Sequence, residues 1–528
     1  MSEDQLPSRP GSPTGAGSPV GPASPVEAAP SASDVPSEGV SPAVGDSSIT
    51  TDDQEALART IPAAGTSKFV VVANRLPVDR VQNDDGSSGW SVSPGGLVTA
   101  LIPVMKDHGG TWVGWVGSSD EHIEPFTFDG YGIMPVELSS QEFNEYYEGM
   151  SNATFWPLYH DCVEHPEYHR EWWDSYMQVN QRFATAAAQA AAPGATVWVQ
   201  DYQLQNVPAL LRQMRPDLKI GFFLHIPFPP TELFMQLPWR YQVISGLLGS
   251  DQVGFQDPGS ARNFAHLVRR LAGMRTQGDR IFSPDGRVIL ARAYPISIDA
   301  QEILDLSRTP EARAEAEQLR EDLGQPDKIF LGVDRLDYTK GLRHRVRAFG
   351  ELFTSGQLDP MRNVYLQIAT PTREGVARYQ VLRSIIDEMV GRINSSVGRI
   401  GRSPIEYRHA SYPKMALAAM YRAADVMVVT PLRDGMNLVA KEYVAAHDSD
   451  AGALVLSEFA GASLELKQAY MVNPYDLNGM KNQLLRAAGD THANHVRRMR
   501  SMRKQVFRHD IDAWASNFLA DLGKERSV

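Results

Sequence analysis

The sequence predicts an α/β protein with two parallel sheets, each flanked by helices. From Lys68 onward, short apolar runs alternate with longer stretches of helical periodicity, which is the pattern of stacked strand–helix units. At 528 residues the chain is longer than one hydrophobic core usually supports, so two folded domains are expected. Open sheets of this class bind ligands at the carboxyl ends of their strands. Functional residues are therefore sought where strands end.

The composition is that of an ordinary globular protein, with 42% hydrophobic and 22% charged residues. No stretch approaches the roughly 20 apolar residues that span a bilayer. A net charge of -12 argues against nucleic acid as the main partner. Cys162 is the single cysteine, which excludes an internal disulfide and a cysteine-based zinc site. The first residues lack the features of a secretory signal, so we expect a cytoplasmic location.

Four segments are expected along the chain. Residues 1–66 form a tail rich in Pro, Ser, Gly and Ala that cannot bury enough apolar surface to fold. Residues 67–299 form the first domain, residues 300–500 the second, and residues 501–528 a helix that crosses back to the first. A charged amphipathic helix over 301–323 opens the second domain. The predicted strands are residues 69–74, 196–201, 219–227, 251–256, 328–336, 363–370, 425–431, 453–458 and 469–474.

Two cations follow the strand over 328–336. Arg335 and Lys340 stand at its carboxyl end, and Gly341 allows a sharp turn into a helix. Cations in this position can neutralise a diphosphate and so stabilise it as a leaving group. The alternative is an ordinary surface pair.

A second anion site is predicted after the strand over 425–431. Gly435 permits a tight turn and a helix begins near Asn437, so main-chain N–H groups of residues 436–439 point out of a helix N-terminus. Asp434 can accept hydrogen bonds from sugar hydroxyls, and Glu442 can accept them from a ribose. Asp434 alone could equally be a capping residue. Together with the two cations, the pattern indicates a nucleoside-diphosphate sugar and therefore a glycosyltransferase.

Several long motifs resemble those of the trehalose-6-phosphate synthase family, which are retaining glycosyltransferases of the GT-B fold. These motifs are VVVANRLP, SPGGLV, YYEGMSNATFWPLYH, FFLHIPFPP, RLDYTKG and PLRDGMNLVAKEY, and the resemblance covers residues 68–522. It implies two Rossmann-like domains that face a cleft. It also implies transfer of glucose from a nucleotide glucose to glucose 6-phosphate, the first step of trehalose biosynthesis, without a metal or other cofactor.

The resemblance assigns the donor contacts. Arg335 and Lys340 meet the diphosphate, and Glu442 holds the ribose. Asp434 and His225 contact glucose hydroxyls, although a lone His beside an apolar strand is usually structural. The remaining donor contacts fall on Gly96, Gly435, Met436, Asn437, Leu438 and Val439.

The resemblance also assigns a set of acceptor contacts. It further assigns a catalytic set, which consists of Asp201 and four of the donor contacts. Arg75 and Arg373 meet the acceptor phosphate from the two domains, whereas Asp201 accepts from hydroxyls. The aromatic members could otherwise be core residues. The acceptor set is Arg75, Trp115, Tyr147, Trp156, Asp201 and Arg373. The catalytic set is Asp201, His225, Arg335, Lys340 and Asp434.

One departure is visible, and some questions stay open. Many relatives carry HDYHL where this chain has QDYQL at 200–204, although Asp201 is kept. A carboxylate nucleophile would have to be Asp201 or Asp434, whereas the resemblance favours same-face displacement without one. The alternatives are a synthase that uses another phosphorylated acceptor, such as glycerol 3-phosphate, and a silent sugar-phosphate sensor. The donor base (UDP, GDP or ADP) is undecided, and a homo-oligomer, dimer or tetramer, is expected.

Overall fold

The computed structural model describes residues 65–82, 88–93, 98, 101–102, 104–106, 109–373, 376–447 and 452–524. The predicted tail therefore lies outside the described residues except for Gly65 and Thr66. Gly96, a predicted donor contact, also lies outside them.

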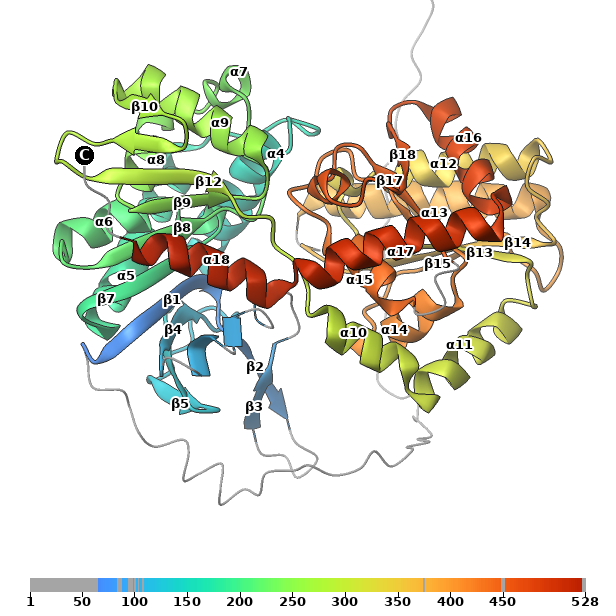
Figure 1. Ribbon diagram of the computed structural model, residues 1–528, viewed down its shortest axis with the longest axis horizontal. Helices are drawn as coiled ribbons and strands as arrows, with labels where there is room; N and C mark the ends of the chain where they lie inside the picture. Colours follow the sequence, from blue (N-terminus) through green and yellow to red (C-terminus); the bar gives the residue numbers. More distant parts are fainter. Residues whose placement is uncertain are drawn as a thin grey trace, which may run out of the picture. The chain divides into compact units, whose positions relative to one another are not determined.

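The first half of the described chain contains a large, mostly parallel sheet (Figure 1). Its inner pairs, from β12 through β6, are all parallel, and the edge pairs β10–β11, β11–β12 and β5–β6 are antiparallel. The ten strands are, in spatial order, β10 (Arg275–Gln277), β11 (Arg280–Phe282), β12 (Val288–Ala293), β9 (Gln252–Phe255), β8 (Lys219–Phe223), β7 (Ala191–Gln200), β1 (Ser67–Arg75), β4 (Thr111–Trp115), β6 (Tyr131–Pro135) and β5 (Phe126–Phe128).

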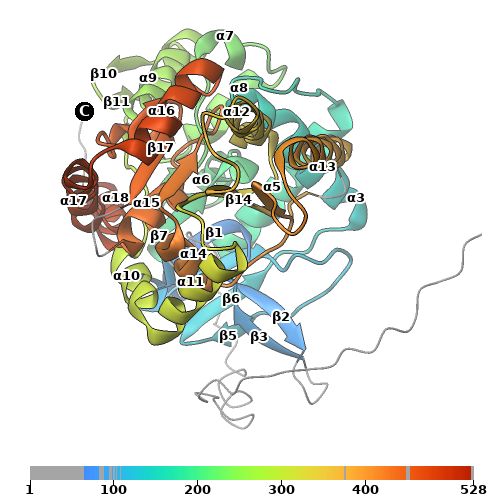
Figure 2. The same ribbon diagram turned by 90° about the vertical axis from the view of Figure 1, so that its right-hand side faces the viewer.

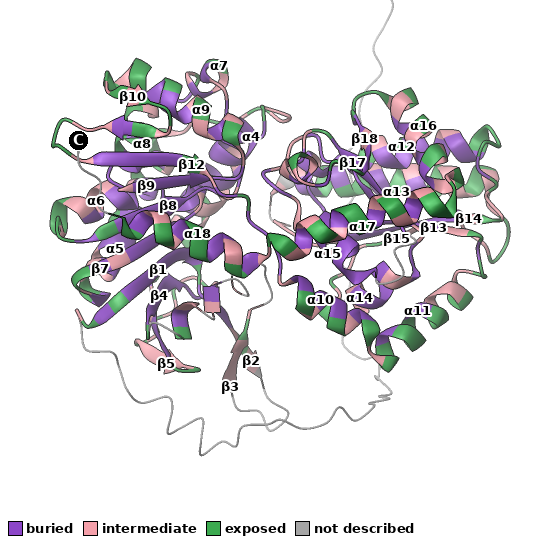
Figure 3. Cartoon of the chain, in the orientation of Figure 1, coloured by how far each residue is buried: buried purple, intermediate pink, exposed green. Residues whose placement is uncertain are grey.

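Helices connect these strands, and a separate antiparallel hairpin joins β2 (Val78–Gln82) to β3 (Ser88–Val92). Val70, Val71 and Val72 of β1 are fully buried, as expected for a central strand covered on both faces. Figure 3 shows the strands of this sheet coloured mostly as buried. The helical elements are α3 (Ser140–Glu142), the π-helix η1 (Phe143–Phe155), α4 (Trp156–Tyr159), α5 (Arg170–Ala190), η2 (Tyr202–Leu204), α6 (Val207–Met214), α7 (Thr231–Phe234), α8 (Arg240–Leu247), α9 (Pro258–Leu267) and η3 (Val268–Ala272).

The second half forms a six-stranded sheet in which every pair is parallel. Its strands are, in spatial order, β15 (Ile405–Arg408), β14 (Asn363–Thr370), β13 (Lys328–Arg335), β16 (Val426–Val429), β17 (Ala453–Ser457) and β18 (Tyr470–Val472). The surrounding helical elements are α10 (Ala300–Arg308), α11 (Pro310–Asp322), η4 (Tyr338–Lys340), α12 (Leu342–Thr354), α13 (Ala377–Val397), α14 (Lys414–Ala423), α15 (Leu438–Ala446), η5 (Gly461–Leu464), α16 (Leu477–Gly489), α17 (His492–Arg508) and α18 (Ile511–Gly523). Helices α12 and α13 lie side by side (Figure 2).

Three predicted elements differ from the structure. The helix expected over 301–323 is two helices, α10 and α11, because Pro310 cannot continue a helix and Thr309 caps the second one. The strand expected over 219–227 ends at Phe223, before a turn toward the Pro-rich segment. The expected C-terminal helix is divided between α17 and α18, and Asp510 caps the latter.

Helix α18 packs on the first sheet, far from its neighbours in sequence. The ring of Phe518 stacks on Trp198, with 4.4 Å between ring centroids. The backbone oxygen of Phe518 accepts a hydrogen bond from Gln252 Nε2 at 2.9 Å. Gly221 and Gly254 leave room for this ring, since an added Cβ at either would lie within 2.8 Å of it.

Replacement of Phe518 should therefore destabilise the protein. We expect Phe518→Ala to lower the free energy of unfolding by about 3–5 kcal/mol, because it empties a fully buried site. Urea unfolding followed by tryptophan fluorescence would measure this change. Ser516→Ala, an exposed position on the same helix, is the matched control and should stay within about 0.5 kcal/mol of the parent.

Candidate active site

A cavity of about 310 Å³ lies where the carboxyl ends of strands from both sheets meet. The first half of the chain contributes His225 and Gln256, and Ile296 comes from the segment that leads into α10. The other lining residues are Val333, Asp334, Arg335, Lys340, Asp434, Met436, Asn437, Leu438 and Val439. Eight of the predicted donor residues are thus brought together, and we call this space the donor cavity.

The two predicted cations differ in their surroundings. Lys340 is buried and its Nζ lies 2.5 Å from Asp434 Oδ2. Arg335 is exposed to the cavity and, within the described residues, makes no ion pair; its guanidinium lies 5.1 Å from the centre of the Trp156 ring. Burial opposes ionisation of Asp434, but Lys340 together with His160 and Asn437 outweighs it, and the pKa of Asp434 is lowered. Among the described residues that line the cavity, Arg335 is thus a cation without an ion-pair partner, whereas Lys340 is paired with a carboxylate.

The turn before α15 is shaped for an anion. Asn437 adopts φ +79°, a backbone conformation that few residues other than glycine accept. Its Oδ1 accepts from the N–H of Ala440 at 3.2 Å, and its Nδ2 donates to Asp434 at 3.2 Å. The side chain of Asn437 thus caps the helix and orients Asp434, while Leu438 and Val439 begin the helix at the cavity wall.

Gly435 brings this turn against the first half of the chain. A Cβ added to Gly435 would lie 2.2 Å from the carbonyl oxygen of His225 and 3.1 Å from the Cα of Ile226. No side chain fits at that distance, so the residue must be glycine for the turn and the end of β8 to approach this closely.

The buried guanidinium of Arg345 holds residues of the donor cavity in place, and the sequence did not reveal this role. Arg345 of α12 is fully buried and donates to Asp334 at 2.7 Å, to Thr430 at 3.0 Å and to the carbonyl oxygen of Lys340 at 3.2 Å. It thereby holds two strand ends and the Lys340 turn together. Asp334 also lines the cavity, so the expectation that Asp201 and Asp434 are the only nearby carboxylates is wrong.

The sequence also did not reveal a contact between α15 and the segment that links the two sheets. Lys441 is buried in α15, and its Nζ donates to the carbonyl oxygen of Ile296 at 2.8 Å and pairs with Glu465 at 2.6 Å. Glu442, the predicted ribose contact, does not line the donor cavity; it accepts from Tyr421 at 2.7 Å, and burial raises its pKa. Neither residue has a sequence pattern that distinguishes a ligand contact from packing.

A second cavity of about 350 Å³ lies at the ends of β1 and β7, and we call it the acceptor cavity. Arg75, Tyr147 and Asp201 of the predicted acceptor set line it. The guanidinium of Arg75 is about half exposed and pairs with Asp79 at 3.1 Å. The other lining residues are Ala73, Asn74, Leu76, Asp79, Ser93, Val98, Trp112, Gln200 and Gln203.

Asp201 stands directly after β7 in a strained conformation, with φ +71°. Its Oδ1 accepts from the N–H of His225 at 3.1 Å. Burial raises the pKa of Asp201 to about 7. Hydrogen bonds from the N–H groups of His225 and Tyr202 lower the pKa but do not cancel the effect of burial, nor do the charges of Arg335 and Arg373. Its carboxyl therefore changes charge near neutral pH.

This shift makes the stability of the protein depend on Asp201. An unfolded chain ionises the residue near pH 3.8, so between about pH 4 and pH 7 the folded state retains a proton that the unfolded state has lost. Stability contributed by this group falls as the pH rises through that window. We expect Asp201→Asn to be more stable than the parent at pH 8, on the order of 4 kcal/mol, and equal to it near pH 4. Thermal unfolding at both pH values would test this expectation.

The remaining predicted acceptor residues lie outside the acceptor cavity. Arg373 has φ +49° and donates to Asp337 at 3.1 Å and to Tyr379 at 2.5 Å. It also donates to Tyr202, in the first half of the chain, at 3.2 Å. Its guanidinium lies 4.0 Å from the centre of the Trp156 ring. Asp337, which the sequence did not indicate, is fully buried and holds Arg373 in place.

Trp115 and Trp156 are both buried. Trp115 donates from its indole N–H to the carbonyl oxygen of Ser118 at 2.7 Å and contacts Tyr147, with 5.9 Å between ring centroids. The guanidinium groups of Arg335 and Arg373 both lie over the ring of Trp156. The structure thus places Trp115 behind the acceptor cavity and Trp156 beside the donor cavity.

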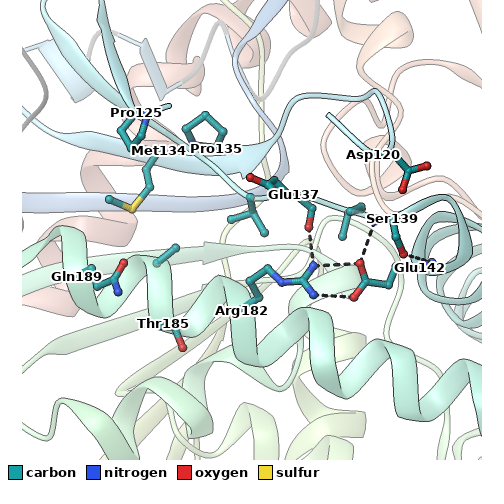
Figure 4. Close-up of a pocket in the computed structure, with 13 residues that line it drawn as sticks. Asp120, Pro125, Met134, Pro135, Glu137, Ser139, Glu142, Arg182, Thr185 and Gln189 are labelled. Atoms are coloured by element: carbon teal, nitrogen blue, oxygen red, sulfur yellow. Dashed lines mark hydrogen bonds and ion pairs between the residues drawn. The ribbon is translucent and has the colours of Figure 1, made fainter. Parts of the chain in front are cut away.

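A larger cavity, of about 680 Å³, holds none of the predicted residues (Figure 4). Arg182 of α5 reaches into it and forms a two-pronged ion pair with Glu142, at 2.7 and 3.0 Å. Arg182 and Glu142 thus pair with each other in this cavity. The volume of a cavity alone therefore does not identify the functional site.

The described part of the chain contains no group of three or more His, Cys, Asp or Glu side chains placed to hold a metal ion. Within the same residues, no helix combines the length and apolar character needed to cross a bilayer.

Comparisons with known proteins agree with this arrangement. Residues 67–524 match the family model of Glycosyltransferase family 20. The chain is 53% identical over 472 residues to a trehalose-6-phosphate synthase of Mycobacterium avium, covering 87% of this chain and 96% of the relative. The resemblance predicted from the motifs is thus confirmed.

Two solved structures have the same fold. One is an alpha,alpha-trehalose-phosphate synthase (UDP-forming) from Burkholderia xenovorans in complex with glucose-6-phosphate, with a TM-score of 0.79 and 34% identity, covering 86% of this chain and 100% of that chain. The other, from E. coli, is bound with UDP-2-fluoro glucose, with a TM-score of 0.80 and 33% identity, covering 87% and 100%. The predicted fold class, α/β with two Rossmann-like sheets, is confirmed.

Proposed function

Because the chain belongs to glycosyltransferase family 20, we propose that it transfers glucose from UDP-glucose to glucose 6-phosphate and so forms trehalose 6-phosphate with retention of configuration. The observation that carries this proposal is the donor cavity. Arg335, Lys340, Asp434 and the N-terminus of α15 all line this cavity. The cations and the helix N-terminus suit a diphosphate, and the carboxylate suits the hydroxyls of the attached sugar.

In the proposed reaction the bond between glucose C1 and the diphosphate oxygen breaks, and its electrons stay on the diphosphate. Arg335, Lys340 and the first turn of α15 stabilise that charge. The 1-hydroxyl of glucose 6-phosphate attacks from the same face, and its proton passes to the departing phosphate. Asp201 binds acceptor hydroxyls, and Arg75 and Arg373 bind the acceptor phosphate.

A carboxylate nucleophile is disfavoured by the surroundings of the candidates. Asp434 Oδ2 pairs with Lys340 and Asp334 Oδ2 with Arg345, and these cations lower the nucleophilicity of both carboxylates. Asp201 lines the acceptor cavity and not the donor cavity. The proposed reaction thus passes through no glucosyl-enzyme. A glucosyl adduct on any carboxylate, detected by mass spectrometry after incubation with the donor, would contradict it.

The direct test is a product assay with purified protein. UDP-, GDP- and ADP-glucose would each be mixed with glucose 6-phosphate, and the released nucleotide and the disaccharide phosphate followed by NMR. We expect an α,α-1,1 product, fastest with UDP-glucose. Glycerol 3-phosphate is the control acceptor and should give no product. Binding of both substrates without turnover would contradict the proposed activity.

We also propose, from the sequence alone, a homo-oligomer in the cytoplasm with no role for nucleic acid. Light scattering on the purified protein would measure the oligomeric state, and cell fractionation would test the location.

A further inference from the structure

Gln200 lies between the two cavities. It is the last residue of β7 and is fully buried. Its Oε1 lies 3.0 Å from Nε2 of His225, which lines the donor cavity, whereas Gln200 itself lines the acceptor cavity. One amide therefore touches both subsites.

The other end of this amide is unsatisfied. Within the described residues, Gln200 Nε2 has no hydrogen-bond partner although it is buried. A buried N–H without a partner costs about 1–3 kcal/mol, so an unpartnered one beside a substrate cavity points to a bond that a ligand completes. Within the described residues Gln203 Oε1 and Ser93 Oγ are likewise unpartnered, and both residues line the same cavity, so a bound acceptor would meet further free hydrogen-bonding groups there.

We propose that Gln200 couples the two subsites: its amide N–H donates to a hydroxyl of the bound acceptor sugar, while its carbonyl oxygen accepts from the Nε2–H of His225. With Nε2 occupied, His225 presents Nδ1 as an acceptor to a hydroxyl of the donor glucose. Gln200 is a specificity-determining residue for the acceptor and a positioning residue for His225. This inference rests on the proposed function.

The amide has two orientations, and in the structure its Oε1 faces Nε2 of His225. A hydroxyl that accepts from Gln200 Nε2 fixes Oε1 toward His225, and this selects the tautomer of His225 that carries its proton on Nε2. Each substrate therefore favours the amide orientation that the other needs. Linkage requires the effect to be reciprocal, so either substrate should raise the affinity for the other.

The coupling can be measured without turnover. We would titrate glucose 6-phosphate into the protein by calorimetry, with and without saturating UDP-2-fluoro glucose as the donor analogue. In the parent we expect the analogue to tighten acceptor binding about fivefold or more. In Gln200→Met, which keeps the volume but removes the amide, we expect less than a twofold effect.

Gln203→Met is the matched control. Gln203 lines the acceptor cavity but has no contact with His225 among the hydrogen bonds described above. We expect it to weaken acceptor binding and leave the fivefold coupling in place. A purely structural role for Gln200 would instead weaken both substrates alike and preserve their coupling.

A measurement on the unaltered protein guards against misfolding of the variants. ¹⁵N NMR of histidine-labelled protein with both ligands bound should show the His225 proton on Nε2, assigned by its loss in His225→Asn. A proton on Nδ1, or full coupling in Gln200→Met, would overturn the inference. Failure of the parent protein to bind or turn over the substrates would instead overturn the proposed function.

Discussion

Lys340→Met is expected to lower kcat by about 10²–10³-fold with a much smaller change in donor affinity. The Nζ of Lys340 is the buried cation beside Asp434, at 2.5 Å, and it faces the cavity that we assign to the diphosphate. Its charge matters most when the diphosphate leaves, so its removal penalises the transition state more than the bound donor. Steady-state kinetics together with calorimetric binding of UDP-glucose would separate the two effects.

The control for this variant is Arg343→Met, an exposed cation on α12 three residues beyond Lys340. It should retain parental kcat. Arg335→Met should resemble Lys340→Met, and the double variant should fall short of the product of the two effects, because both cations stabilise one charge. A Lys340→Met enzyme with altered KM but parental kcat would show that the cation only binds substrate.

Gly435→Ala is expected to lower kcat/KM about 100-fold while the protein remains folded. The added Cβ would lie 2.2 Å from the carbonyl oxygen of His225, and neither backbone can yield without a shift of the turn that carries Asp434 and Asn437. Displacement of a catalytic group by about 1 Å can cost this much.

Gly391→Ala is the matched control for this prediction. Gly391 lies within α13, where an added Cβ meets nothing within 4 Å, and alanine is the better helix former. We expect parental activity and equal or higher thermal stability. Parental kcat/KM in Gly435→Ala would show that the close approach to His225 is not needed for the reaction.

The sequence predicted the parts of the molecule that local pattern determines. The Val-rich run of β1 and the uninterrupted apolar strand β13 are buried on both faces, and their pattern alone indicated parallel strands. The short edge strands β10 and β11 were missed, because three residues are too few for a period to emerge. The site residues at strand ends were found because a parallel sheet brings such ends to one edge.

Tertiary contacts decided what the sequence did not predict. Arg345 lies in a charged helical stretch and looks exposed, yet it is fully buried under the Lys340 turn. The contacts of Arg373 with Asp337 and Tyr379 were not predicted either, because the positions of these partners depend on how distant segments meet. The role of Gln200 depends on the orientation of a single amide, which no residue pattern encodes.

The last helix imposes an order on synthesis of the chain. The first sheet is complete once β12 ends at Ala293, but Phe518 and Trp514, which cover Trp198 and Phe223, are made much later. At 5–20 residues per second the nascent sheet would wait on the order of 10–40 s with that aromatic surface uncovered. A chain that ends before Ile511 would therefore keep this aromatic face of the sheet exposed, and exposed apolar surface of this kind promotes aggregation.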